Sequence, residues 1–145
     1  MARHSNRLLT DALAQALTDA GLLVDVGIKP DGGGWQGSPG ASTFEPYTVL
    51  YPSIGGASDG PICDPFTDVA ADFIITSFGA TPTQAMWGAD EAREALTSPG
   101  TIVVVGRVVM LAIPDVEGGV IRDDDVQPPI YSSPCRWRLM TTAAA

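Results

Sequence analysis

The sequence predicts an α+β fold, in which a mostly antiparallel sheet of about four to five strands carries two main helices packed on one face. Apolar residues recur at helical spacing in two segments, residues 5–20 and 81–96. Other segments have the β-branched or alternating pattern of strands, and stretches rich in glycine and proline separate them. At 145 residues the chain has the length of one domain, which we expect to span residues 1–145.

The first helix is expected over residues 5–20. Its apolar positions share one face: Leu8, Leu9, Ala12, Leu13, Ala16, Leu17 and Ala20. The residues before it are expected to be mobile, because chain ends commonly fray. Gly21 can end the helix, since glycine adopts the left-handed conformation that closes many helices. Residues 22–26 then have the pattern of a short strand.

Two long loops are expected, at residues 29–42 and 52–68, because both are rich in Gly, Pro, Asp and Ser. Between them, residues 44–51 have the pattern of a strand, which Pro46 restricts to a sheet edge or to the beginning of the strand. Long loops on a compact domain commonly carry function or bind a partner. We therefore expect these two loops to contact other proteins.

The best-marked strand and helix follow each other in the middle of the chain. Residues 69–78 are apolar on both alternating faces, which is typical of a central strand. The next helix has Thr81 as its N-cap, Pro82 in its first turn and Gln84 at the capping-box position. A Pro-Gly pair at residues 99–100 ends it. A stripe of mostly small side chains would face the sheet: Ala85, Ala89, Ala92 and Leu96.

The last part of the chain is again β. A strand is expected over residues 102–113 with an interruption at a Gly-Arg pair, followed by a turn at residues 115–119. In the final strand, residues 135–140, apolar residues alternate with two arginines. This is the period of a half-buried strand, so we expect Trp137 in the core.

The charge balance excludes several classes of function. The chain has 8 Lys and Arg against 17 Asp and Glu, a net charge of −9, whereas nucleic-acid-binding surfaces are basic. The longest apolar run, residues 101–113, is shorter than the roughly 20 residues that span a bilayer, so no membrane association is expected. Without the pattern of a signal peptide, Cys63 and Cys135 are expected to be reduced thiols of a cytoplasmic protein.

No catalytic residue, cofactor site or metal site is predicted. The only histidine, His4, lies before the first helix, where it cannot readily be held against a nucleophile. The glycine-rich residues 31–37 lack the Gly-Lys-Ser/Thr of a phosphate-binding loop. We therefore expect a protein that is not an enzyme.

An acidic run at residues 123–125 keeps an alternative open. It lacks the spacing of a calcium loop, but hard-cation sites draw carboxylates from several segments, and Asp59, Asp64 or Asp68 could converge on it. The chain would then be a metal-dependent hydrolase. Otherwise the run is a solvated turn, or one that pairs with another subunit. A small-ligand binding module is a third possibility, although no pattern indicates a ligand.

Two tryptophans are candidates for contacts with partners. Trp35 lies in the glycine-rich loop, where a large aromatic without periodic apolar neighbours is expected to meet a partner. Trp87 lies off the small-residue stripe, so it covers the helix flank or anchors an interface. The residues expected at interfaces are Trp35, Asp59, Trp87, Arg122, Asp123, Asp124 and Asp125.

Short phrases after the amphipathic first helix occur in an order that resembles one protein family. The phrases are YTVLYP (47–52), GGASDGP (55–61), FIITSFG (73–79), a helix with Gln84 and Trp87 (81–96), GGVIRDDDVQPP (118–129) and RWRLMTT (136–142). In this order the sequence resembles the tail terminator proteins of long-tailed, siphovirus-type phages that infect actinobacteria. The resemblance covers residues 8–142.

The resemblance implies a structural protein of the virion. Such terminators form a hexameric ring that caps the finished tail tube, stops its polymerisation and presents a surface for the DNA-filled head. The implied partners are further copies of the chain, the tail tube protein and the head-completion (connector) protein, with DNA passing through the ring without specific binding. Assembly would take place in the host cytoplasm. Within the same class, the alternative is a head-completion or other minor tail protein.

Overall fold

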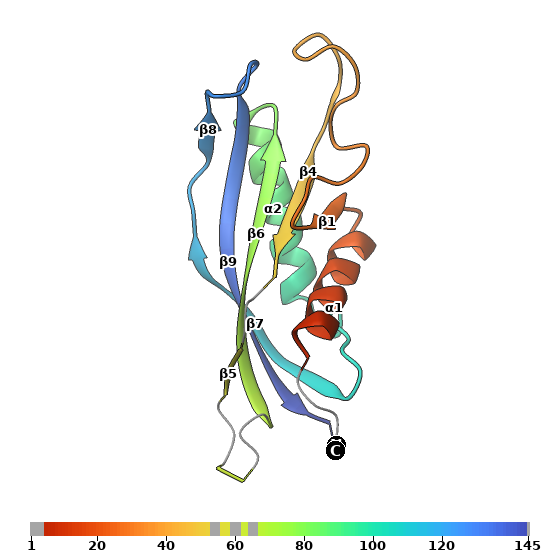
Figure 1. Cartoon of the computed structure of the whole chain (residues 1–145), viewed down its shortest axis with the longest axis vertical. Coiled ribbons are helices and arrows are strands. Elements are labelled where there is room, and N and C mark those ends of the chain that lie inside the picture. The colour runs from red at the N-terminus through yellow and green to blue at the C-terminus, as the bar shows by residue number, and fades with distance from the viewer. Residues whose placement is uncertain (1–4, 53–55, 59–61, 64–66, 145) are drawn as a thin grey trace.

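The computed structural model describes residues 5–52, 56–58, 62–63 and 67–144. It confirms the α+β fold class, with two helices and a mostly antiparallel sheet (Figure 1). The sheet has seven strands instead of the expected four to five, and a second sheet has two. The additional strands have only two or three residues, which is too short for a periodic sequence pattern. Residues 1–4, expected to be mobile, lie outside the described part.

Both helices begin after a residue whose side chain caps the first turn, and the sequence predicts the second of these caps, Thr81. Helix α1 (Asn6–Asp19) starts after Ser5, whose side chain accepts a hydrogen bond from the Leu8 amide at 3.3 Å. Helix α2 (Pro82–Thr97) starts after Thr81, which accepts from the Gln84 amide at 3.2 Å. These bonds satisfy amides that have no partner inside the helix. Neither described helix is long and apolar enough to cross a membrane.

Two long strands form the centre of the main sheet. Strand β6 (Asp68–Gly79) pairs antiparallel with β9 (Ile130–Ala143), from Asp68 opposite Thr142 to Gly79 opposite Tyr131. This confirms residues 69–78 as a central strand. The final strand is longer than the predicted residues 135–140 because the mostly polar residues on either side, 131–134 and 141–142, also pair with β6.

Shorter strands line the outer edges of this central pair. On β6, strand β4 (Tyr47–Tyr51) is followed along the same edge by β5 (Gly56–Ser58). On β9, strand β7 (Arg107–Glu117) is followed by β8 (Ile121–Asp123). Strands β6 and β9 therefore each pair, along the outer edge, with two shorter strands that follow one after the other.

The N-terminal part contributes a parallel pair and a small hairpin. Strand β1 (Val24–Val26) pairs with β4 in parallel, the exception in an otherwise antiparallel sheet. Pro46 divides the predicted strand 44–51 into β3 (Phe44–Glu45) and β4, and β3 pairs with β2 (Gly34–Trp35). The loop predicted at residues 29–42 therefore contains a strand.

Two predicted boundaries between residues 102 and 119 are wrong. Residues 102–106 are outside the strands, because Gly106, at φ 74°, turns the chain between Val104 and Arg107, which form an isolated bridge. At the other end β7 continues to Glu117, so the turn predicted at residues 115–119 begins only after it.

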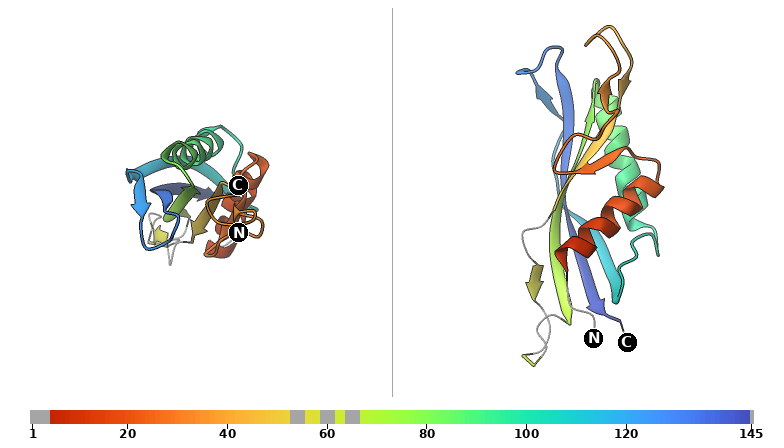
Figure 2. Two further views of the ribbon diagram at one scale, coloured as in Figure 1. Left: turned by 90° about the horizontal axis from the view of Figure 1, so that it is seen from above. Right: turned by 45° about the vertical axis from the view of Figure 1, so that its right-hand side comes forward.

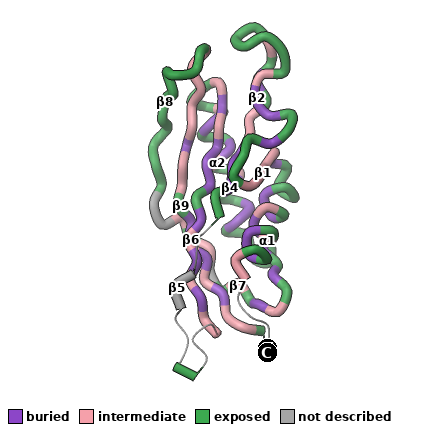
Figure 3. The backbone as a smooth tube through the Cα atoms, viewed as in Figure 1, coloured by how far each residue is buried: buried purple, intermediate pink, exposed green. Residues whose placement is uncertain are grey.

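The hydrophobic core lies between the sheet and both helices, which pack on the same face (Figure 2). Figure 3 shows the buried backbone concentrated along this contact. Trp137 is 2% exposed, which confirms it as a core residue. Its largest buried neighbours in this cluster are Leu9, Leu13, Leu17, Leu50, Phe73, Ile75, Leu96 and Leu139.

Candidate interaction surfaces

One end of the sheet face opposite the helices is covered by aromatic residues. Tyr47 and Phe78 are paired across β4 and β6, and their rings stack with centroids 4.9 Å apart. Phe44 lies 6.1 Å from Tyr47, and Trp35 packs edge-on against Phe44 at 5.2 Å. Trp35 is therefore half buried by its own hairpin, although its Nε1 has no hydrogen-bond partner among the described residues. Its contact with a partner stays a prediction.

The rest of this face carries a cluster of exposed side chains that we call the sheet patch. The register aligns its members in two rows across the strands. The first row is Tyr51, Ile74 and Arg136, and the second is Asp72, Arg138 and Ile113. Tyr51, Ile74 and Ile113 are 41%, 44% and 37% exposed. Arg138 donates to Asp72 at 3.1 Å, and both side chains remain open to solvent.

The outer surface of α2 carries a second cluster, the helix patch, made of Met86, Trp87, Asp90 and Glu94. Positions four residues apart lie on the same side of a helix, which brings Met86, Asp90 and Glu94 into line. Met86 and Trp87 are each 47% exposed. The packed side of α2 is formed by Ala85, Gly88, Ala92, Ala95 and Leu96. The structure therefore places Trp87 on the solvent side of the helix.

The acidic run lies on and after β8, at the end of the molecule. Arg122 Nε pairs with Asp124 at 2.6 Å, which raises the pKa of Arg122 above its ordinary value through the hydrogen bond and the opposite charge. The Asp123 carboxylate accepts the Asp125 amide at 3.0 Å. All four side chains are exposed. The carboxylates of Asp123 and Asp124 thus already have a hydrogen-bond or ion-pair partner within the turn itself.

The proposed convergence of other acids on this run is wrong for Asp68. Asp123 pairs with Ile130, next to the end of β6 at Gly79, whereas Asp68 lies at the opposite end of β6. The 12 residues of β6 place its two ends about 35 Å apart. Asp59 and Asp64 lie outside the described residues. Within the described part of the chain, no three His, Cys, Asp or Glu side chains are grouped to hold a metal ion.

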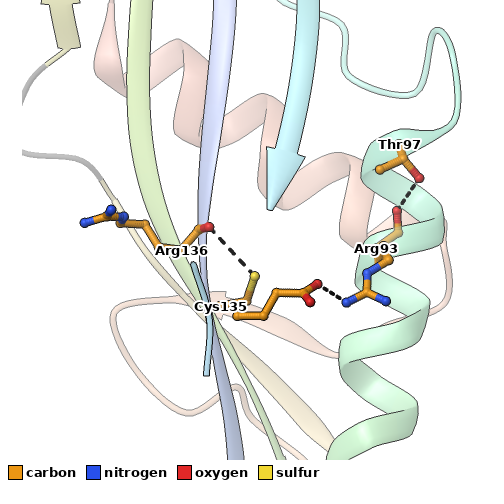
Figure 4. A network of polar contacts seen from close by, with 5 residues as sticks. Arg93, Thr97, Cys135 and Arg136 are labelled. Carbon is orange, nitrogen blue, oxygen red and sulfur yellow. Dashed lines mark hydrogen bonds and ion pairs between the residues drawn. The ribbon is translucent and has the colours of Figure 1, made fainter. Parts of the chain in front are cut away.

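A cavity of about 310 Å³ lies between α2 and β9 on the helix side of the sheet. Cys135 and Ser77 are among its lining residues, together with the paired Arg93 and Glu117. Figure 4 shows Cys135 and Arg93 on the same side of β9. Ser77 Oγ is buried and has no hydrogen-bond partner among the described residues. The backbone of α2 approaches Ser77 closely at Gly88. A Cβ atom at Gly88 would lie only 2.9 Å from Ser77 Cβ.

Partial burial raises the pKa of the Cys135 thiol above its ordinary value, and the nearby Arg93 opposes this shift only in part. In a Cys63→Ser variant, we expect the alkylation of Cys135 by iodoacetamide to rise with pH later than for an ordinary thiol, because only the thiolate reacts. Measuring the rate from pH 7 to 10.5 in buffer and in urea checks this. Identical profiles in the two solvents would contradict it.

The sequence predicted Trp87 and the acidic run as exposed interface candidates but missed the sheet patch. The sequence feature that could have indicated this patch is the pair of arginines that alternate with Trp137 on the last strand, in a chain with few basic residues. No family model matches the chain, and a comparison with curated proteins found no relative.

Proposed function

We propose that the chain is a structural subunit of a phage virion, which caps the tail tube as a ring, ends tube polymerisation and forms the surface on which the head docks. The order of phrases that resembles tail terminators supports this proposal. The observation that carries it is the exposure of two different surfaces, the sheet patch and the helix patch, which each combine apolar and charged side chains and lie on opposite sides of one sheet.

Unlike surfaces on opposite sides favour head-to-tail association. Each copy offers one surface to the copy before it and the other to the copy after it, and the chain of contacts closes into a ring when the rotation between copies allows it. The partners would be further copies, the tail tube protein and the connector. The place of action would be the head-proximal end of the tail, after assembly in the host cytoplasm.

The acidic composition suits a ring through which DNA moves. Six copies with a net charge of −9 each would carry −54. A negative lumen repels phosphate groups, so DNA would slide through it without specific binding. Basic residues lining the lumen would contradict this part of the proposal.

The test is light scattering over a concentration series, with negative-stain microscopy, followed by mixing with polymerising tail tube protein of the same phage. We expect rings of about six copies, and shorter tubes with a cap at one tip. A protein that stays monomeric and leaves tube length unchanged would contradict the proposal. A ring that binds the connector but leaves tube length unchanged would favour a head-completion protein.

A further inference from the structure

We infer that the helix patch of one copy docks on the sheet patch of the next copy. The occupant of the open sheet face is thus α2 of a second, identical chain. This inference rests on the proposed function, because it describes how identical copies would meet in a ring.

The first argument is that, in the described part of the chain, the helices lie on one face of the sheet and leave the other face without a helical layer. A sheet with apolar side chains on a face is stable when another element covers that face, and a helix is the usual cover. Helices α1 and α2 cover only one face, while Tyr51, Ile74 and Ile113 remain exposed on the other. The helix patch offers Met86 and Trp87 to such a face. Half-exposed tryptophans of this kind commonly anchor interfaces.

The second argument is the complementary charge of the two patches. The sheet patch contains two arginines and one aspartate, in a chain that carries an excess of acids. The helix patch contributes Asp90 and Glu94. The one arginine of α2, Arg93, pairs with Glu117 of β7 instead of adding positive charge to the patch. Opposite charges at the edge of an apolar contact fix its orientation and exclude wrong partners.

The third argument is that the two patches cannot meet within one copy. The residues of β9 alternate in direction, so Arg136 lies on the side of the strand away from α2, while Cys135 lies on the helix side (Figure 4). The patches therefore lie on opposite sides of the sheet. Only a second copy can bring them together, and the resulting contact is heterologous.

A competing mode of association, strand addition at β7, is disfavoured by the strand itself. Strand β7 forms one outer edge of the sheet, where unpaired amides could receive another chain. Pro114 has no amide to donate, and the register of β7 shifts twice, between Val109 and Leu111 and between Pro114 and Val116. These features interrupt a continuous ladder of hydrogen bonds. Docking through side chains on the face of the sheet avoids this obstacle.

The test exchanges the charges of the two patches. In the first variant, Arg136→Glu makes the sheet patch acidic. In the second, Asp90→Lys with Glu94→Lys makes the helix patch basic. We expect each variant alone to associate at least tenfold more weakly than the original protein in light scattering, because like charges then face each other. Mixing the two variants, or combining all three substitutions in one chain, should restore association to within about threefold.

Two outcomes would overturn the inference. If each variant alone associates like the original protein, or if both fail and neither the mixture nor the combined variant recovers, these patches do not meet. If the protein without substitutions still forms rings in such an experiment, only this inference fails and the proposed function stands. If the protein without substitutions stays monomeric at millimolar concentration and does not cap tubes, the inference and the proposed function are both contradicted. Circular dichroism checks folding, and Ile74→Ser and Trp87→Ala repeat the test if a charge variant does not fold.

Discussion

Replacing Trp137 by alanine is expected to lower the free energy of unfolding by about 3–5 kcal/mol, the range for truncating a buried large aromatic. The indole is 2% exposed and lies opposite Phe73 in the middle of the central strand pair, within the cluster that joins both helices to the sheet. Its removal leaves a cavity that close-packed neighbours can fill only partly. Urea unfolding at low protein concentration measures the change.

Trp87→Ala is the matched control for this variant. The same side chain is removed, but from a position that is 47% exposed on the outer surface of α2. Surface substitutions of this kind change stability by about 0.5 kcal/mol or less. Equal losses for the two variants would show that Trp137 is not a core residue in solution.

Gly79→Ala is expected to destabilise the fold by about 3 kcal/mol, the upper part of the range for overpacking. Gly79 is the last residue of β6, and α2 begins three residues later. A Cβ atom at Gly79 would lie 2.5 Å from Gln84 Cβ and 2.7 Å from the backbone nitrogen of Ala85. Because the backbone of α2 is one of the clashing groups, a change of rotamer cannot relieve the strain. Thermal unfolding compared with the original protein gives the measurement.

Gly119→Ala is the corresponding control. A Cβ atom at Gly119 meets nothing within 4 Å, and its φ lies outside the left-handed region. The free energy of unfolding should stay within about 0.5 kcal/mol of the original value. A small effect at Gly79 as well would mean that β6 and α2 are further apart than the structure indicates.

The sequence predicted those parts of the fold that depend on local chemistry. The cap at Thr81, most of the apolar face of each helix and the central strand are fixed by residues close to one another along the chain. Two members of the predicted apolar face of α1, Leu8 and Ala20, are exposed instead. The alternation of apolar residues with arginines on the last strand also predicted Trp137 in the core. These features need no knowledge of which strand pairs with which.

The parts that were not predicted depend on pairing between distant segments. Ile102 and Val104 are buried while Val103 and Val105 are exposed, which is the alternation of a strand, yet these residues have only one isolated bridge. Strands β5 and β8 consist of three residues each and are recognisable only because β6 and β9 offer free edges.

The candidate interaction surfaces also divide into one that local sequence predicts and one that depends on the pairing of distant strands. Trp87 was expected to lie off the alanine stripe, where it covers the helix flank or anchors an interface, because its position relative to that stripe is a local property of the helix. The sheet patch was missed because it needs the register of four strands, which brings Tyr51 beside Ile74 and Ile113 beside Arg138. No local pattern contains that information.

The pairing of β6 with β9 also sets an order of events in time. Residues 80–129 lie between these strands, so the entropy of closing a long loop opposes the central pair until its contacts have formed. Topologies dominated by such distant pairings fold in milliseconds to seconds. Since the sheet patch draws side chains from β4, β6, β7 and β9, it comes into existence only when the last of these strands is in place. A chain that has not finished folding lacks this docking surface, so only fully folded subunits can join the assembly.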